Sequence, residues 1–170
     1  MAEKAIGEYN AAIKKDPNSL PAHMGLGIIY ELQKKPDKAK EFYQKALKVN
    51  PKFAPAANNL AYLYAERGEN IDEALNLAQS AKEQFPDDPH ISDTLGWVYY
   101  KKNIFSRAIV YLNEAVEKLK DSPTVHFHLG MAYYKNGDKE NAKKELKRAL
   151  ELDSKFPGSE EARATLKEIK

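Results

Sequence analysis

The sequence predicts an all-α fold in which pairs of short helices repeat along the chain. A leucine followed by a small residue recurs at intervals of 34, 35 and 34 positions within the 170 residues. Turn-forming segments such as "KKPD", "RGEN" and "KNGD" separate the helical stretches. The composition agrees, because 42% hydrophobic and 31% charged residues with only eight Gly and nine Pro are typical of an ordered, helix-rich chain.

The small residue of each motif follows a leucine and precedes a tyrosine by three positions. It is Gly27, Ala61, Gly96 and Gly130 in turn. Two alanines seven positions apart follow in each case, as the pairs Ala39/Ala46, Ala74/Ala81, Ala108/Ala115 and Ala142/Ala149, and once more at the start as Ala5/Ala12. Small side chains at these positions let two antiparallel helices approach closely, while Leu and Tyr fill the space around the contact.

This spacing divides the chain into a lone helix over about 3–15, four helix pairs from about 20 to 153, and a last helix near 159–169. In the last helix we expect Ser159 as the N-cap and Ala162, Leu166 and Ile169 as one apolar stripe. A helix with one apolar face is suited to capping a repeat array, and we expect it to cover Leu146 and Leu150.

The motif resembles that of the tetratricopeptide repeat, in which leucine–glycine is followed by tyrosine, by alanines and by a late proline. Pro17, Pro51 and Pro86 hold the late-proline position, whereas the early tryptophan of the pattern is absent throughout. The resemblance implies a right-handed α-solenoid whose first helices line a concave surface. It also implies one domain over 1–170, made of a half repeat (1–19), four repeats (20–53, 54–88, 89–122, 123–156) and a capping helix (157–170).

The C-terminal part of the sequence also resembles the end of long bacterial tetratricopeptide arrays, which leaves the cytoplasm and the periplasm of a bacterium both open as compartments. The first helix occupies a second-helix position without its partner, so we expect the chain to be part of a longer array. Such a half repeat leaves an apolar face uncovered, and self-association through it is one expectation.

A second stripe runs along each first helix, away from the leucine–glycine–tyrosine seam. Its central members form a ladder of Ile28, Tyr62, Trp97 and Met131. By the resemblance, this stripe faces the concave surface, where apolar and aromatic side chains indicate a contact surface for a partner. The predicted peptide-binding groove consists of Met24, Ile28, Glu31, Asn58, Asn59, Tyr62, His90, Asp93, Trp97, Tyr100, Phe127, Met131 and Tyr134.

The same ladder has a structural alternative. Successive first helices of a curved array lie next to one another, so Trp97 and its neighbours can instead pack between repeats. The two interpretations differ in exposure. As a groove residue, Trp97 is expected to be partly shielded and accessible to a small quencher, whereas as a packing residue it is buried.

The groove indicates a protein–protein interaction scaffold that binds an extended peptide or a helix, with Asn58 and Asn59 available to a peptide main chain. Relatives that hold chaperone C-termini use a clamp of Lys, Asn and Arg, of which only Asn59 is matched here. Two alternatives are a helical repeat that binds single-stranded RNA and a self-assembling structural scaffold. The near balance of 27 Lys and Arg against 25 Asp and Glu argues against nucleic acid.

No residue pattern in the sequence indicates catalysis, a cofactor or a small-molecule substrate. Cysteine is absent, which excludes disulfides, thiolate metal sites and cysteine nucleophiles. No two of the four histidines have the spacing of a metal site, and His23 and His126 hold a helix-packing position. Neither a membrane-spanning apolar run nor a signal-peptide core occurs in the sequence.

Overall fold

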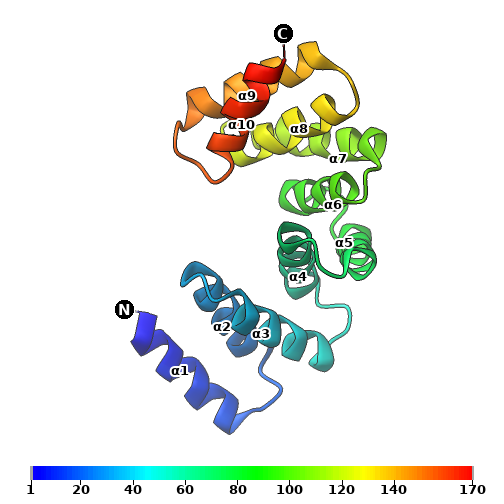
Figure 1. Ribbon diagram of the computed structural model, residues 1–170. Helices are drawn as coiled ribbons and strands as arrows, with labels where there is room; N and C mark the ends of the chain where they lie inside the picture. Colours follow the sequence, from blue (N-terminus) through cyan, green and yellow to red (C-terminus); the bar gives the residue numbers. More distant parts are fainter. Residues whose placement is uncertain (1, 170) are drawn as a thin grey trace. The chain divides into compact units, whose positions relative to one another are not determined.

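The structure is a computed structural model that describes residues 2–169, and in this range it contains ten helices and no strand (Figure 1). The chain divides into two compact units, with the boundary between Gln84 and Phe85. The first unit contains α1 (Ala2–Lys15), α2 (Leu20–Leu32), α3 (Pro36–Val49), α4 (Ala54–Arg67) and α5 (Ile71–Gln84). The second contains α6 (Pro89–Lys101), α7 (Phe105–Lys118), α8 (Pro123–Lys135), α9 (Lys139–Leu152) and α10 (Ser159–Glu168). The prediction of one continuous domain stays a prediction.

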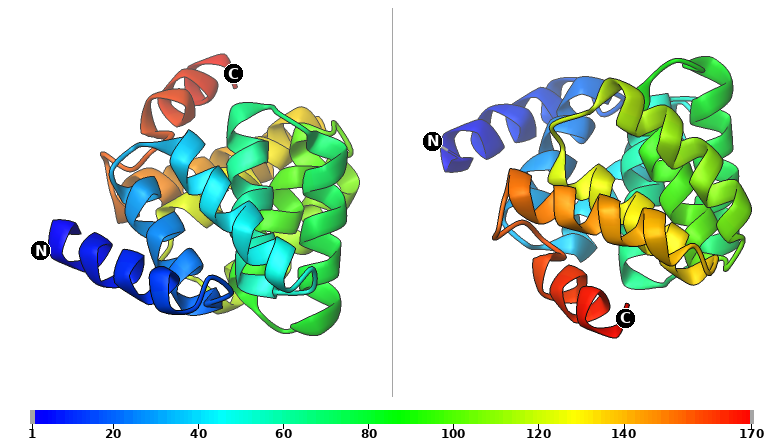
Figure 2. Two further views of the ribbon diagram at one scale, coloured as in Figure 1. Left: turned by 90° about the horizontal axis from the view of Figure 1, so that it is seen from below. Right: turned by 90° about the horizontal axis from the view of Figure 1, so that it is seen from above.

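In the first unit, α2 packs on α3 and α4 packs on α5, as the repeat pattern predicts. The lone helix α1 lies along α2, and α3 joins the two pairs by its contact with α4 (Figure 2). The ring of Tyr9 from α1 occupies the space beside Gly25 of α2. α1 packs on α2 as α3 packs on α4, so α1 takes the place of the second helix of a repeat. This is the position that its alanines predict.

In the second unit, α6 packs on α7 and α8 packs on α9, and these two pairs meet through α7, α6 and α8. The seam of each pair depends on its glycine. A Cβ atom added at Gly96 would lie 2.6 Å from Leu112 Cγ, and one added at Gly130 would lie 2.7 Å from Leu146 Cγ. Both leucines are fully buried. The small residue therefore lets the large side chain of the second helix reach the backbone of the first.

The last helix, α10, lies against α9 and α8 (Figure 2). The expectation that Ser159 is its N-cap is wrong: the N-cap is Gly158, whose φ of 102° is left-handed, and Ser159 is the first helical residue. A side chain at Gly158 would also meet the ring of Phe127, because a Cβ atom there would lie 2.8 Å from Phe127 Cε1. The turn into α10 thus requires glycine for its backbone conformation and for packing.

The apolar stripe of α10 is buried as predicted at Ala162 and Ile169, with Leu166 half-buried. α10 lies against α9, which carries Leu146 and Leu150, and the expectation that it covers these two leucines stays a prediction. Thr165 of α10 donates a hydrogen bond to the sulfur of Met131 at 3.6 Å, so α10 reaches the first helix of the preceding pair. Leu146 is also buried in the seam with Gly130.

Candidate peptide-binding surface

The first unit has an open groove on α2 and α4, and it begins at the α2–α3 seam. Tyr43 of α3 is fully buried against Gly27, where an added Cβ would lie 2.3 Å from the tyrosine ring. From this position its hydroxyl donates to Glu31 Oε2 at 2.6 Å and accepts a hydrogen bond from Asn59 Nδ2 at 3.3 Å. One buried hydroxyl thus joins a carboxylate of α2 to an amide of α4.

The environment of Tyr43 keeps this hydroxyl protonated. Burial is the main cause that raises the pKa of Tyr43 far above its ordinary value, and the Glu31 carboxylate raises it further. A protonated hydroxyl must donate to an acceptor when it is buried, and Glu31 is that acceptor. The Glu31 side chain is therefore held in one orientation at the surface of the unit.

The groove has a volume of about 490 Å³ and is lined by Ile28, Glu31, Leu32 and Asn59. Ile28, Glu31 and Leu32 share one face of α2, since they are spaced by three and four positions. Ile28 is 41% exposed and Leu32 is 79% exposed, so two aliphatic side chains flank a held carboxylate. Three of these four residues belong to the groove predicted from sequence. Leu32 was missed, although an apolar residue just before the "QKKPD" turn is a detectable signal.

Trp97 is buried, with an exposed fraction of 3%, so the expectation that solvent reaches it is wrong. Its ring stacks on Tyr100 at 4.5 Å between centroids and on His128 of α8 at 4.0 Å. Phe127 of α8 lies at 6.0 Å, and the Lys101 ammonium lies 4.7 Å from the ring centroid. Trp97 thus packs between two successive first helices, which is the structural alternative.

Phe127 and Met131 of α8 are covered in the same way, so the expectation that they line an open surface is also wrong. Phe127 is 4% exposed and packs on Phe156 at 5.6 Å, and Met131 is 2% exposed beneath Thr165. Tyr134 is half-buried and donates to Glu168 of α10 at 2.6 Å. The segment 156–168 thus occupies the face of α8 on which a partner was expected.

The other predicted groove residues lie in several environments. Tyr100 is half-buried beside Trp97, and its burial raises the pKa of its hydroxyl to about 12. Asp93 accepts from His128 Nδ1 at 2.8 Å, and His90 is exposed. In the first unit, Met24, Asn58 and Tyr62 are half-buried. Asn58 donates to Asn59 at 3.4 Å, and its Oδ1 is buried with no hydrogen-bond partner among the described residues. Binding at these positions stays a prediction.

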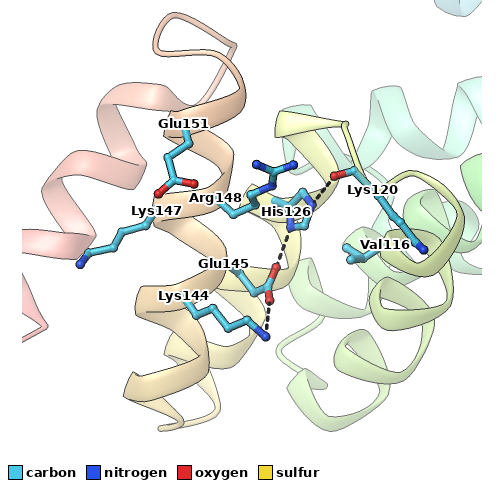
Figure 3. Close-up of a pocket in the computed structure, with 8 residues that line it drawn as sticks. All are labelled: Val116, Lys120, His126, Lys144, Glu145, Lys147, Arg148 and Glu151. Carbon is cyan, nitrogen blue, oxygen red and sulfur yellow. Dashed lines mark hydrogen bonds and ion pairs between the residues drawn. The ribbon is translucent and has the colours of Figure 1, made fainter.

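The histidines at the packing position are buried, as predicted, and one belongs to a charged cluster (Figure 3). His126 of α8 lies 2.6 Å by Nδ1 from Glu145 Oε2 of α9 and 2.9 Å by Nε2 from the Lys120 carbonyl oxygen. Both nitrogens face acceptors, so the protonated ring satisfies both. The hydrogen bond to Glu145 is the largest cause that raises the pKa of His126, and the Lys120 carbonyl adds to it, while burial opposes both.

Replacing Glu145 by Gln is expected to remove a pH-dependent contribution to the stability of this pair of helices. Because the pKa of His126 is raised in the folded chain, the contribution is fully present below the ordinary histidine value of about 6.5 and is lost as pH rises through the folded value. We expect Glu145→Gln to cost about 1 kcal/mol at pH 5.5 and much less at pH 8.5 in urea unfolding. Glu151→Gln, an exposed acid beside the same cluster, is the control. An equal cost of Glu145→Gln at both pH values would contradict the assignment.

The described residues contain no group of three or more side chains suited to hold a metal ion. Within the same range, every helix is too short or too polar to cross a membrane.

Comparison with known families identifies the repeats. Four sequence models of the tetratricopeptide repeat match residues 21–53, 42–76, 96–137 and 123–156. Together with the helix pairs and their glycine seams, these matches decide the family. The chain is a tetratricopeptide repeat protein. Such proteins are, in general, protein–protein interaction scaffolds.

Among curated proteins, this tetratricopeptide repeat protein is 28% identical over 114 residues to the TPR repeat-containing protein PA4667 of Pseudomonas aeruginosa. The aligned region covers 67% of this chain and 19% of that protein. It is 31% identical over 91 residues to the human E3 SUMO-protein ligase RanBP2, covering 54% of this chain and 3% of that protein. The chain thus spans a small part of the length of these relatives.

Solved structures of similar fold include PilF of Pseudomonas aeruginosa (TM-score 0.74, 21% identity, 99% of this chain and 81% of that one). PilW, described as a type IV pilus biogenesis factor, has a TM-score of 0.77 at 19% identity and covers 99% of this chain and 82% of that one. YrrB, described as having an unusual peptide-binding site, has a TM-score of 0.71 at 19% identity, with 96% and 84% covered. These neighbours confirm the all-α helical-repeat fold.

Proposed function

We propose that this tetratricopeptide repeat protein binds a partner protein through the α2–α4 groove of its first unit. The observation that supports the proposal is the pair of exposed aliphatic side chains, Ile28 and Leu32, on either side of the Glu31 carboxylate. Exposed apolar residues of this size are costly to solvate and are typical of contact surfaces when they adjoin a fixed polar group.

The chemistry of the groove defines the segment that fits it. Ile28 and Leu32 offer an apolar surface to an aliphatic or aromatic side chain. Glu31 accepts hydrogen bonds and carries negative charge, which favours a Lys or Arg side chain of the partner. The Asn59 amide can bond to a peptide main chain. A peptide with a basic residue next to an apolar one therefore satisfies all four lining residues. No observation favours RNA binding or self-assembly, and both stay predictions.

Selection of random peptides on the immobilised chain tests this proposal. We expect enriched sequences that combine a basic and an apolar residue, and we expect the peptides of this class to compete with one another for one site. Calorimetry with the best peptide then gives its affinity for the chain and for its variants. Failure to enrich any peptide with a basic residue next to an apolar one would contradict the proposed chemistry of the groove.

Replacing Leu32 by Lys is expected to weaken the selected peptide about tenfold or more, because it removes the apolar contact and places a cation beside the basic residue of the ligand. Leu32 is 79% exposed, so the thermal midpoint is expected to stay within about 2 °C of the parent value. The matched control is Val110→Lys on α7, where an aliphatic side chain is 56% exposed outside the groove. Equal binding by Leu32→Lys and Val110→Lys would exclude the groove as the binding site.

A further inference from the structure

A second site lies in the first unit, away from the α2–α4 groove, around His23. His23 and His126 hold the same position in the first and the fourth repeat. In each, the Nε2 atom of the ring bonds to a backbone carbonyl oxygen. His23 Nε2 lies 2.8 Å from the Pro17 carbonyl oxygen, and His126 Nε2 lies 2.9 Å from that of Lys120. In both repeats the acceptor is six residues before the histidine.

The two histidines differ at the other ring nitrogen. Nδ1 of His126 pairs with the Glu145 carboxylate at 2.6 Å. The residue at the position of Glu145 in the first unit is Phe42, whose ring centroid lies 6.2 Å from that of His23. His23 is only 4% exposed, yet its Nδ1 has no hydrogen-bond partner among the described residues. A buried polar atom without a partner is costly, and few occur in a folded protein.

A pocket of about 390 Å³ adjoins His23 between α1 and α3. Its cationic side chains are Lys45 and Lys48 of α3, and no carboxylate is among the residues that line it. Ile13, Phe42 and Val49 form apolar walls. The corresponding pocket of the second unit, drawn in Figure 3, is lined by His126 and contains the carboxylate of Glu145. The pocket beside His23 therefore has lysine ammonium groups and a histidine, but it lacks a carboxylate at the place of Glu145.

We propose that the pocket beside His23 binds a carboxylate of a partner peptide, an Asp or Glu side chain next to an apolar residue. The carboxylate pairs with Nδ1 of His23 as Glu145 pairs with His126, and Lys45 and Lys48 add attraction at the rim. Nδ1 is shielded from solvent in the free chain, so the ring of Phe42 must turn aside as the carboxylate enters. The partner thus supplies the group that the other repeat carries in its own sequence.

Binding in this geometry places the carboxylate of the peptide against a protonated His23 ring. Nε2 already donates to the Pro17 carbonyl, so donation from Nδ1 as well requires the protonated ring. The charged groups around the site are Lys45 and Lys48 of α3, with Glu41 bonded to Lys45 and Asp16 bonded to the Asn18 backbone amide. α1 contributes the uncharged Asn10 and Ile13. We therefore expect tighter binding at pH 5.5 than at pH 8.

Titration of the full chain with acetyl-Leu-Glu-Leu-amide, followed by NMR of the histidine rings, tests the proposal. We expect the ring signals of His23 to shift with saturation, while those of His126, which already has its carboxylate, stay unchanged. The neutral peptide acetyl-Leu-Gln-Leu-amide is expected to bind about tenfold more weakly. Equal binding of the two peptides, equal shifts of both histidines, or an affinity that does not rise at pH 5.5 would overturn the proposal.

Two variants locate the site. Phe42→Glu places a carboxylate of the chain itself beside His23, so it is expected to weaken the Glu peptide at least about tenfold. Circular dichroism reports whether this variant folds, and Lys48→Glu, an exposed change at the rim, supplies the same test without altering a packed residue. Lys48→Glu is expected to weaken the Glu peptide, whereas Lys52→Glu, outside the pocket, leaves its affinity unchanged. Undiminished binding to Lys48→Glu, or to a folded Phe42→Glu, would refute the site.

Discussion

Replacing Trp97 by Ala is expected to lower the free energy of unfolding of the second unit by about 3–5 kcal/mol. The indole is 3% exposed and lies between Tyr100 and His128, so truncation leaves a cavity between two first helices. Urea unfolding followed by circular dichroism measures the loss. In the parent chain, whose only tryptophan is Trp97, we also expect blue-shifted emission that a small neutral quencher barely reaches.

Phe85→Ala is the control for this prediction, since Phe85 is an aromatic residue that is 51% exposed. It is expected to cost less than about 1 kcal/mol. Two results would contradict the packing role of Trp97. One is a cost for Trp97→Ala as small as that for Phe85→Ala. The other is free access of the quencher to the indole.

Replacing Ala162 by Asp is expected to detach α10 and to destabilise the second unit by about 3 kcal/mol or more. Ala162 is fully buried, and a charged side chain there has no partner to compensate for its loss of water. Once α10 leaves, Met131 loses the cover of Thr165, and a buried side chain of this size is worth about 1.5–3 kcal/mol. Thermal unfolding and hydrogen exchange of residues 159–168 measure the effect.

Ala164→Asp makes the same chemical change two positions away on the exposed face of α10. It is expected to leave both the thermal midpoint and the exchange protection nearly unchanged. If the two aspartates destabilise the protein equally, the effect belongs to helix propensity and not to the docking of α10. A folded Ala162→Asp variant with an unchanged midpoint would show that α10 adds nothing to the stability of the unit.

The order of the helices, and the approximate extents of α1 and α10, could be predicted from the sequence because the determinants are local. Leucine, a small residue and tyrosine at fixed spacing specify the face by which two adjacent helices pack. The structure places Gly96 against Leu112 and Gly130 against Leu146, as close approach at these small residues requires. The N-cap of α10 was misplaced by one residue, since Gly158 has a left-handed backbone and packs against the ring of Phe127, which is distant in sequence.

The sequence also determined which residues form the second stripe of each first helix. Whether that stripe is exposed was decided by the first helix of the following repeat, which is α4 for α2 and α8 for α6. Trp97 and Ile28 are equivalent rungs of one ladder. Trp97 is covered because α8 presents the large rings of Phe127 and His128 to it. At the positions of those two rings, α4 has Asn58 and Asn59, which are short, and Ile28 stays 41% exposed. Helical periodicity gives the face on which a side chain lies, whereas only the size of the side chains packed against it determines whether that face is open.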